Sequence, residues 1–231
     1  MYRSKDIEFT QSNLDKLIEN KISTIFVRND EKNLFYRYVE NYLNDIINDP
    51  EIPLSEKSGI IYDTSKHLME DVIKNPRSGI HIKRSQELVN NYLDYILNNA
   101  GAFHSLIKIT SYDYYTYTHS VNVCIFSIGL STKLGLDKKD IYEVGVGGLL
   151  HDVGKSKIPQ EILNKKGNLD NREFSIVKKH PLYSFEILKE NNTLSNRVLI
   201  IAHQHHEKLN SRGYPAGIGK DSIHPFSKIV T

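Results

Sequence analysis

Helix start and stop signals follow one another through the second half of this 231-residue chain and leave room for little except helices. Apolar periodicity predicts a long helix over 115–134, with Gly135 in the usual C-terminal capping position. A second helix should follow, capped by Asp137 and ending near Leu150. Three more helix starts are marked by the capping-box pair Asp170 and Glu173, by Pro181 and by Ser195.

The first half of the sequence is more mixed. Residues 1 to about 50 predict a small α/β unit, with a short helical stripe near Leu14, a β-type run over 22–27 and a helix over 31–47. A short lone strand needs a partner, so this unit is either incomplete or forms a homodimer. Helical periodicity continues over 55–99, with a break at Asn75 before Pro76. The fold class is therefore mainly α, a helical bundle preceded by a small mixed α/β and helical region.

Composition excludes several classes of protein. The net charge is only +2, which argues against binding a nucleic-acid polymer through bulk charge, although a small anionic ligand remains compatible. Cys124 is the single cysteine and is predicted to be a buried core thiol, so there is no disulfide framework. The N-terminus lacks the pattern of a signal peptide, and no apolar run reaches the roughly 18 residues that span a membrane. We therefore expect a cytoplasmic protein without a membrane segment.

Two clusters of ionisable residues stand at predicted helix ends. His151 and Asp152 end one apolar helix, and Lys155 follows within one turn, where its ammonium could neutralise a phosphate oxygen. His205 and His206 end another, followed by Glu207, whose carboxylate could orient an imidazole. Taken alone, each cluster is more simply explained as a polar helix end.

The order of the histidines changes that interpretation. His119 and His180 are isolated, but together with the two clusters they lie on, or at the end of, successive predicted helices. A helical bundle can direct such residues into one site. Five imidazoles and one carboxylate are enough to hold two metal ions and leave positions for water and substrate, which suits in-line displacement at phosphorus. Predicted metal ligands are His119, His151, Asp152, His180, His205 and His206.

Several motifs occur in a shared order: YTYTHSVNV, LLHDVGKSKIP, NKKGNL, KKHP and HHEKLNSRGYP. In order and approximate spacing they resemble the HD-GYP domain over about residues 111–231. The resemblance implies an all-helical HD bundle with a metal centre, hydrolysis of cyclic di-GMP to linear pGpG or GMP, and the same six metal ligands. It also implies that Lys155 contacts a phosphate of the substrate.

The tripeptide that names that family corresponds to Gly213, Tyr214 and Pro215. Gly-Tyr-Pro is a rigid turn that presents an aromatic ring, either to the substrate groove or to a partner such as a diguanylate cyclase or another signalling domain. From the residues alone, a plain surface turn is the simpler interpretation.

The sequence departs from the family pattern in several places. Tyr115 stands where some members carry a glutamate, which favours two metal ions over three. Asn210 and Ser211 replace the usual Asp-Gly, and Ser184 replaces a glycine. The chain also stops at Thr231, before a helix that carries a further aspartate ligand in the family. The expected domains are therefore an N-terminal regulatory or dimerising region, 1–100, and an apparently truncated HD-GYP domain, 101–231.

Two functional classes follow. The first is a cyclic di-GMP phosphodiesterase, in which metal-bound hydroxide attacks phosphorus and Asp152 and Lys155 are the catalytic residues. Iron, manganese and zinc suit the imidazole and carboxylate ligands equally well. The second is a non-hydrolytic cyclic di-GMP sensor or protein scaffold, which the changes at Asn210 and Ser211 favour. An HD hydrolase of another nucleotide is a third, to which the Gly-Tyr-Pro turn is an objection.

Overall fold

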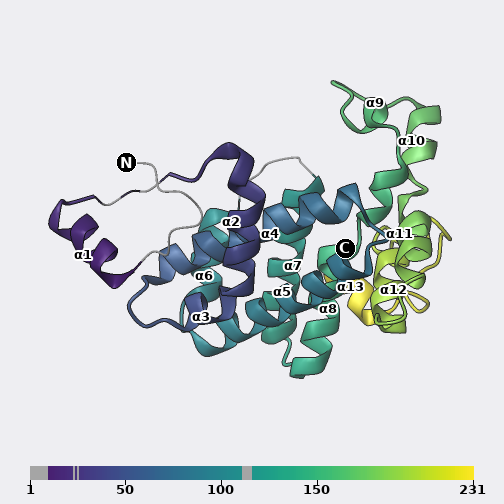
Figure 1. Ribbon diagram of the computed structural model, residues 1–231. Helices are drawn as coiled ribbons and strands as arrows, with labels where there is room; N and C mark the ends of the chain where they lie inside the picture. The colour runs from purple at the N-terminus through teal and green to yellow at the C-terminus, as the bar shows by residue number, and fades with distance from the viewer. Residues whose placement is uncertain (1–9, 23, 25, 111–115) are drawn as a thin grey trace. The chain divides into compact units, whose positions relative to one another are not determined.

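The computed structural model describes residues 10–22, 24, 26–110 and 116–231, and these residues form helices and turns without a strand (Figure 1). Contacts divide the chain into two units, residues 1–38 and residues 39–231. The predicted mainly helical fold is confirmed. None of the helices in the described part is long and apolar enough to cross a membrane.

The N-terminal unit contains α1 (Gln11–Glu19), the 3₁₀ turn η1 (Asn29–Glu31) and most of α2 (Lys32–Asn41). The predicted stripe near Leu14 lies on α1, as expected. The strand predicted over 22–27 is wrong for the residues described there, and Ser23 and Ile25 lie outside them. A strand is stabilised by a neighbouring backbone, and the described residues offer this run no second strand.

The second unit begins with α3 (Leu43–Asn48), α4 (Leu54–Lys74), α5 (Gly79–Asn98) and α6 (Ala102–Ile109). The single helix predicted over 31–47 is interrupted at Tyr42, which separates α2 from α3. The predicted break at Asn75 is confirmed between α4 and α5.

The remaining helices carry the predicted start and stop signals. Asp137 accepts a hydrogen bond from the backbone N–H of Asp140, Asp170 and Glu173 form a capping box, and Ser195 caps its helix. Gly135 has a positive φ of 74°, as a C-terminal cap requires. These elements are α7 (Thr116–Lys133), α8 (Lys138–Leu150), η2 (Val153–Lys157), α9 (Gln160–Leu163), α10 (Asn171–Val177), α11 (His180–Lys189), α12 (Asn196–Gln204) and α13 (Pro225–Val230).

Helices α4 and α5 pack into the same core as α7 and α8. Their two large buried tyrosines keep their hydroxyls paired: Tyr92 bonds with Ser65 at 2.9 Å and Tyr95 with Ser58 at 2.8 Å. Cys124 is buried in this core, as predicted. Residues 39–100 thus pack together with the helices that follow them, and a separate functional role for residues 1–100 stays a prediction.

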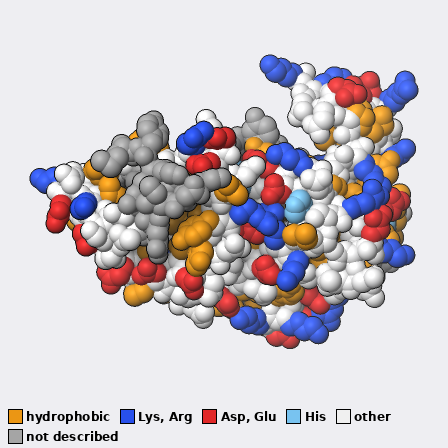
Figure 2. All heavy atoms as spheres, viewed as in Figure 1, with side chains coloured by type: hydrophobic (Ala, Val, Ile, Leu, Met, Phe, Trp, Pro, Cys, Tyr) orange, Lys and Arg blue, Asp and Glu red, His pale blue; other side chains and the backbone are white. Residues whose placement is uncertain are grey.

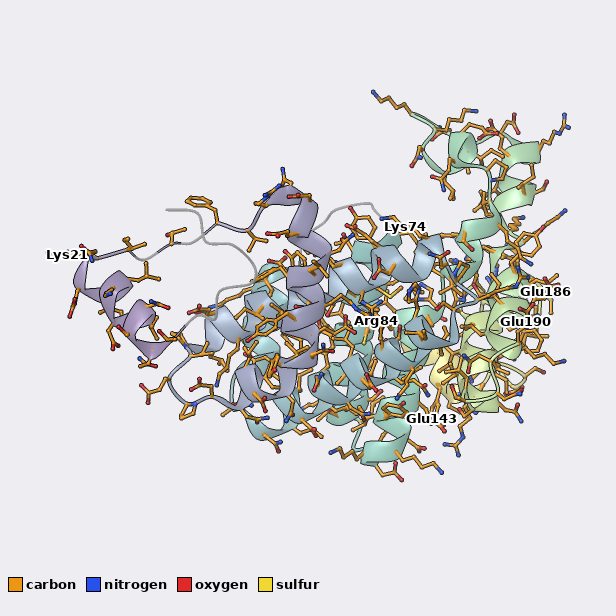
Figure 3. All side chains as sticks on the ribbon, viewed as in Figure 1. Lys21, Lys74, Arg84, Glu143, Glu186 and Glu190 are labelled. Carbon is orange, nitrogen blue, oxygen red and sulfur yellow. The ribbon has the colours of Figure 1, made fainter. Side chains whose placement is uncertain are left out.

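A buried arginine joins three helices of this unit. Arg84, labelled on α5 in Figure 3, makes a bidentate ion pair with Glu40 on α2, at 2.7 and 2.6 Å, and contacts Asp71 on α4 at 3.0 Å. A planar guanidinium suits such a two-oxygen contact, and burial raises the cost of removing either partner. The last turn of α2, which belongs to the second unit, is therefore fixed to α4 and α5.

Glycines allow α8 to approach its neighbours closely. A Cβ added at Gly147 would lie 2.4 Å from Cδ1 and 3.0 Å from Cβ of Ile201 on α12. A β-branched side chain has little freedom to move aside. Gly147 therefore keeps α12, and the histidines at its end, close to α8.

We predict that Gly147→Ala lowers the free energy of unfolding by about 1–3 kcal/mol because it overpacks the α8–α12 contact. The matched control is Gly59→Ala on α4, where an added Cβ meets nothing within 4 Å. That variant should gain about 0.5–1 kcal/mol from helix propensity. Urea denaturation measures both; equal stability changes in the two variants would contradict the packing argument.

Candidate metal centre

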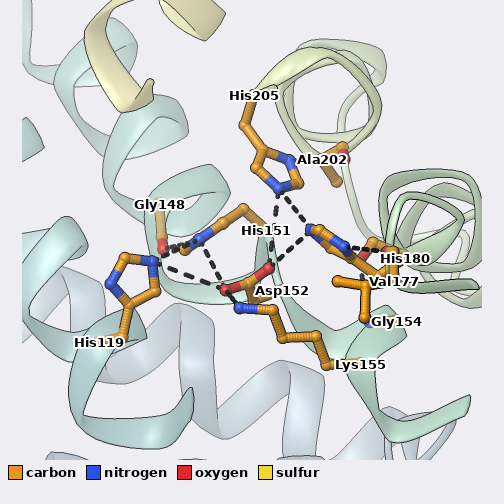
Figure 4. A network of polar contacts seen from close by, with 11 residues as sticks. His119, Gly148, His151, Asp152, Gly154, Lys155, Val177, His180, Ala202 and His205 are labelled. Atoms are coloured by element: carbon orange, nitrogen blue, oxygen red, sulfur yellow. Dashed lines mark hydrogen bonds and ion pairs between the residues drawn. The ribbon is translucent and has the colours of Figure 1, made fainter. Parts of the chain in front are cut away.

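The structure brings all six predicted ligands together. Figure 4 shows the contacts among His119, His151, Asp152, His180 and His205. His119 lies within α7, whereas His180 is the first residue of α11. His151 and His205 directly follow the last residues of α8 and α12, so each lies where a helix ends. The remaining ligands, Asp152 and His206, directly follow His151 and His205 in the sequence.

The Asp152 carboxylate lies between two groups of imidazoles. Its Oδ2 is 3.2 Å from Nε2 of His151 and 3.6 Å from Nε2 of His119. Its Oδ1 is 3.1 Å from Nε2 of His180 and 3.7 Å from Nε2 of His205. Two sets therefore share Asp152, one with His119 and His151, the other with His180, His205 and His206.

Three of the imidazoles are oriented by backbone carbonyls near the ends of the preceding helices. The Nδ1–H of His151 donates to the Gly148 carbonyl at 2.7 Å, that of His180 to Val177 at 2.7 Å, and that of His205 to Ala202 at 2.9 Å. In each pair the acceptor lies three residues earlier. A proton on Nδ1 leaves the Nε2 lone pair of the neutral ring directed at the carboxylate, the form in which histidine binds metals.

These groups fit a cation. Asp152 is almost fully buried, and its Oδ1 accepts no hydrogen bond. Nε2 of His180 and Nε2 of His205 approach each other to 3.0 Å, although neither carries the proton in this tautomer. Converging lone pairs around a buried anionic oxygen are costly without a positive charge among them. The chemistry of the donors therefore matches a divalent metal ion.

Electrostatics keeps the donors in their binding forms. Burial by itself raises the pKa of Asp152, but the interactions of its carboxylate with His151 and Lys155 outweigh this effect and hold the pKa well below 3.8. Burial and neighbouring imidazoles lower the pKa of His119 and His205 to about 4, and that of His206 to about 2. At neutral pH the carboxylate is ionised and these imidazoles are neutral.

Lys155 lies beside the carboxylate, and its predicted contact with a phosphate of the substrate stays a prediction. Its Nζ donates to Oδ2 of Asp152 at 2.6 Å, and its side chain is 22% exposed. The ammonium thus has one contact at the centre and one side open to a ligand.

The Gly-Tyr-Pro turn packs against the centre. The Tyr214 ring stacks on His206, with ring centroids 4.6 Å apart and planes at 23°. Gly213 has no room for a side chain, because an added Cβ would lie 2.4 Å from the backbone nitrogen of Lys208. Burial raises the pKa of Tyr214 to about 12, so the phenol keeps its proton. Pro215 follows through a cis peptide bond.

Glu207 has a different role from the one its position suggested. Its buried carboxylate accepts hydrogen bonds from the backbone N–H groups of Ala216 at 2.7 Å, Gly217 at 3.1 Å and Ile218 at 3.1 Å. Within the described part of the chain it makes no hydrogen bond to an imidazole. Glu207 therefore fixes the loop after the Gly-Tyr-Pro turn to the end of α12.

Two departures from the family pattern are accommodated locally. Oγ of Ser184 accepts a hydrogen bond from the Gly154 N–H at 2.8 Å and so joins α11 to η2. Ser211 takes the positive φ, 60°, that a glycine adopts more easily, while Oδ1 of Asn210 accepts from the Arg212 N–H at 3.1 Å. Tyr115 lies outside the described residues.

We predict that the metal-free protein loses stability as the pH falls from about 6.5 to 4. The unfolded chain takes up protons on histidines near the ordinary pKa of 6.5, whereas folded His205 and His206 resist protonation until pH 4 or below. Urea denaturation in the presence of a chelator, repeated across this pH range, measures how steeply the free energy of unfolding falls with pH. His206→Asn should flatten it and His104→Asn, an exposed control, should not; identical slopes in both would contradict the burial argument.

Comparison with known proteins gives a consistent assignment. The family described as HD domain matches residues 102–231. A cyclic di-GMP phosphodiesterase of Pseudomonas aeruginosa is 33% identical over 72% of this chain and 41% of its own length. A 3'3'-cGAMP-specific phosphodiesterase of Vibrio cholerae is 29% identical over 76% of this chain and 40% of its own. The chain thus spans about two fifths of the length of these curated relatives.

One solved structure shares the fold. It is described as an HDG"Y"P protein from Bdellovibrio bacteriovorus and aligns with a TM-score of 0.75, covering 99% of this chain and 75% of that one at 24% identity. The matched family covers more than half of the chain and includes all six clustered ligands. The chain belongs to the HD domain family, and its domain is of the HD-GYP type.

Proposed function

We propose that this chain is a metal-dependent phosphodiesterase that hydrolyses cyclic di-GMP to linear pGpG, GMP or both. The observation that carries the proposal is the buried Asp152 carboxylate, which lies between two sets of imidazoles and beside Lys155. Relatives named as cyclic di-GMP phosphodiesterases support the choice of substrate.

In this proposal the centre holds two divalent ions, of iron, manganese or zinc. His119 and His151 would bind one ion, His180, His205 and His206 the other, and Asp152 both. When bound, such a pair supplies an activated water nucleophile and neutralises charge that develops on phosphate oxygens. The protein needs no serine or cysteine nucleophile for this reaction.

Lys155 and Tyr214 are assigned to the substrate. Cations at the centre would compensate the Asp152 charge that Lys155 now pairs with, so the ammonium can turn to a non-bridging phosphate oxygen. The ring of Tyr214 stacks on His206, which supports a role for Gly213, Tyr214 and Pro215 as a wall of the substrate groove. Contact of this turn with a diguanylate cyclase or another signalling domain, and a homodimer, stay predictions.

Another cyclic dinucleotide is the second candidate substrate. The Vibrio cholerae relative named for 3'3'-cGAMP is similar over 76% of this chain, so the HD-GYP domain type by itself does not fix the bases. The sensor alternative is less favoured because a protein that only binds the ligand has no need for a buried carboxylate between five imidazoles. Hydrolysis assays with both dinucleotides identify the preferred substrate, and binding without hydrolysis of either would indicate a sensor.

We predict that Asp152→Asn lowers kcat/KM for cyclic di-GMP by at least about 100-fold and abolishes binding of one or both metal ions, because the shared ligand loses its charge. Metal analysis and product chromatography measure the two effects. The matched control is Asp63→Asn, a surface acid paired with Lys66 on α4. Full metal content in the Asp152 variant would refute the ligand assignment.

We predict that Tyr214→Ala keeps both metals and raises KM by roughly 10-fold, because the variant loses aromatic contact area beside the centre. Tyr214→Phe retains the ring and should restore most of the affinity. If Tyr214→Ala instead releases metal, the stacked ring supports His206 and does not bind substrate.

A further inference from the structure

An open cavity of about 430 Å³ lies next to the metal centre. Lys155 belongs to both places: it lines the cavity, and its Nζ is 2.6 Å from Oδ2 of Asp152. A nucleotide whose phosphate lies at the centre therefore has this cavity beside it. Its volume falls within the range typical of small-molecule sites, about 300–1,000 Å³.

The cavity is built in part by α4, which precedes the matched HD domain. Glu70, Ile73 and Lys74 come from α4, whereas the family match begins at residue 102. Figure 3 labels Lys74 near the end of this helix, and Figure 2 shows basic side chains near a surface-exposed histidine on this face. The motifs shared within the HD domain family therefore do not determine the residues that α4 contributes to this cavity.

The lining combines apolar and hydrogen-bonding groups suited to a purine. Ile73 and Leu163 provide apolar walls, and the amides of Gln160 and Asn164, joined by a 3.1 Å hydrogen bond, provide donors. Glu70 is 34% exposed, and its carboxylate is 3.9 Å from Nδ1 of His67, beyond hydrogen-bond distance. Glu70 thus adds an accessible acceptor.

An acceptor with two oxygens distinguishes the two purines. Guanine presents two adjacent donors, N1–H and the N2 amine, which match a carboxylate in a bidentate contact. Adenine presents a lone pair at N1, which a carboxylate repels. Lys74, four residues after Glu70 and on the same face of α4, can meet a phosphate while Glu70 meets the base.

We infer that this cavity is a guanine subsite and that Glu70 is its specificity-determining residue. The inference rests on the proposed function, because it assumes a cyclic dinucleotide at the metal centre. It predicts that the enzyme favours substrates with at least one guanine, cyclic di-GMP and 3'3'-cGAMP, over cyclic di-AMP.

The test compares cyclic di-GMP, cyclic di-IMP and cyclic di-AMP on the metal-loaded full chain. Cyclic di-IMP keeps N1–H but lacks the N2 amine. Wild type should prefer cyclic di-GMP to cyclic di-AMP, and Glu70→Gln should lower kcat/KM for cyclic di-GMP by roughly 10- to 100-fold with little effect on cyclic di-AMP. The variant should also lose most of the preference for cyclic di-GMP over cyclic di-IMP.

Glu56→Gln is the matched control, since Glu56 is exposed on the first turn of α4 and does not line the cavity. Metal content and thermal unfolding should be unchanged in both variants. If Glu70→Gln keeps the guanine preference, or wild type treats the three ligands alike, the guanine subsite is refuted.

Titration calorimetry with the same three ligands separates this inference from the proposed function. A wild-type protein that binds but never cleaves cyclic di-GMP refutes the phosphodiesterase proposal. Loss of the guanine preference in Glu70→Gln binding then still supports the subsite.

Discussion

The buried Asp152 carboxylate is the constraint on which the rest of the centre depends. An ionised carboxylate removed from water is unstable unless positive charge or donors surround it. Here one ammonium donates to Oδ2, while the other oxygen, Oδ1, faces imidazole lone pairs and accepts no hydrogen bond. Four helices must pass or end at this point to supply the donors, which fixes where α8 and α12 stop relative to α7 and α11.

A hydrogen bond from a histidine side chain to a backbone carbonyl serves both the helix end and the ligand chemistry. The last carbonyls of a helix have no partner within it and need donors from elsewhere. His151 and His205 supply such donors through Nδ1 to Gly148 and Ala202. The same hydrogen bond fixes the tautomer, so the end of each helix and the direction of each lone pair are set together.

Local sequence signals made many of the helix boundaries predictable. Caps at Asp137, Asp170 and Ser195 could be predicted because they act within four residues, and two of the helices that they start, α8 and α12, are followed directly by ligands. The strand expected over 22–27 was wrong for the residues described there, because a strand depends on a distant partner. The loop contacts of Glu207 and the bond from Gly154 to Ser184 also depend on packing between elements, which periodicity does not reveal.

The bond between Gly154 and Ser184 has a mechanical consequence. His180 and Ser184 lie four residues apart, on one face of α11, and Gly154 follows Asp152 by two residues. The hydrogen bond therefore couples the position of α11, which carries His180, to the turn that directly follows Asp152.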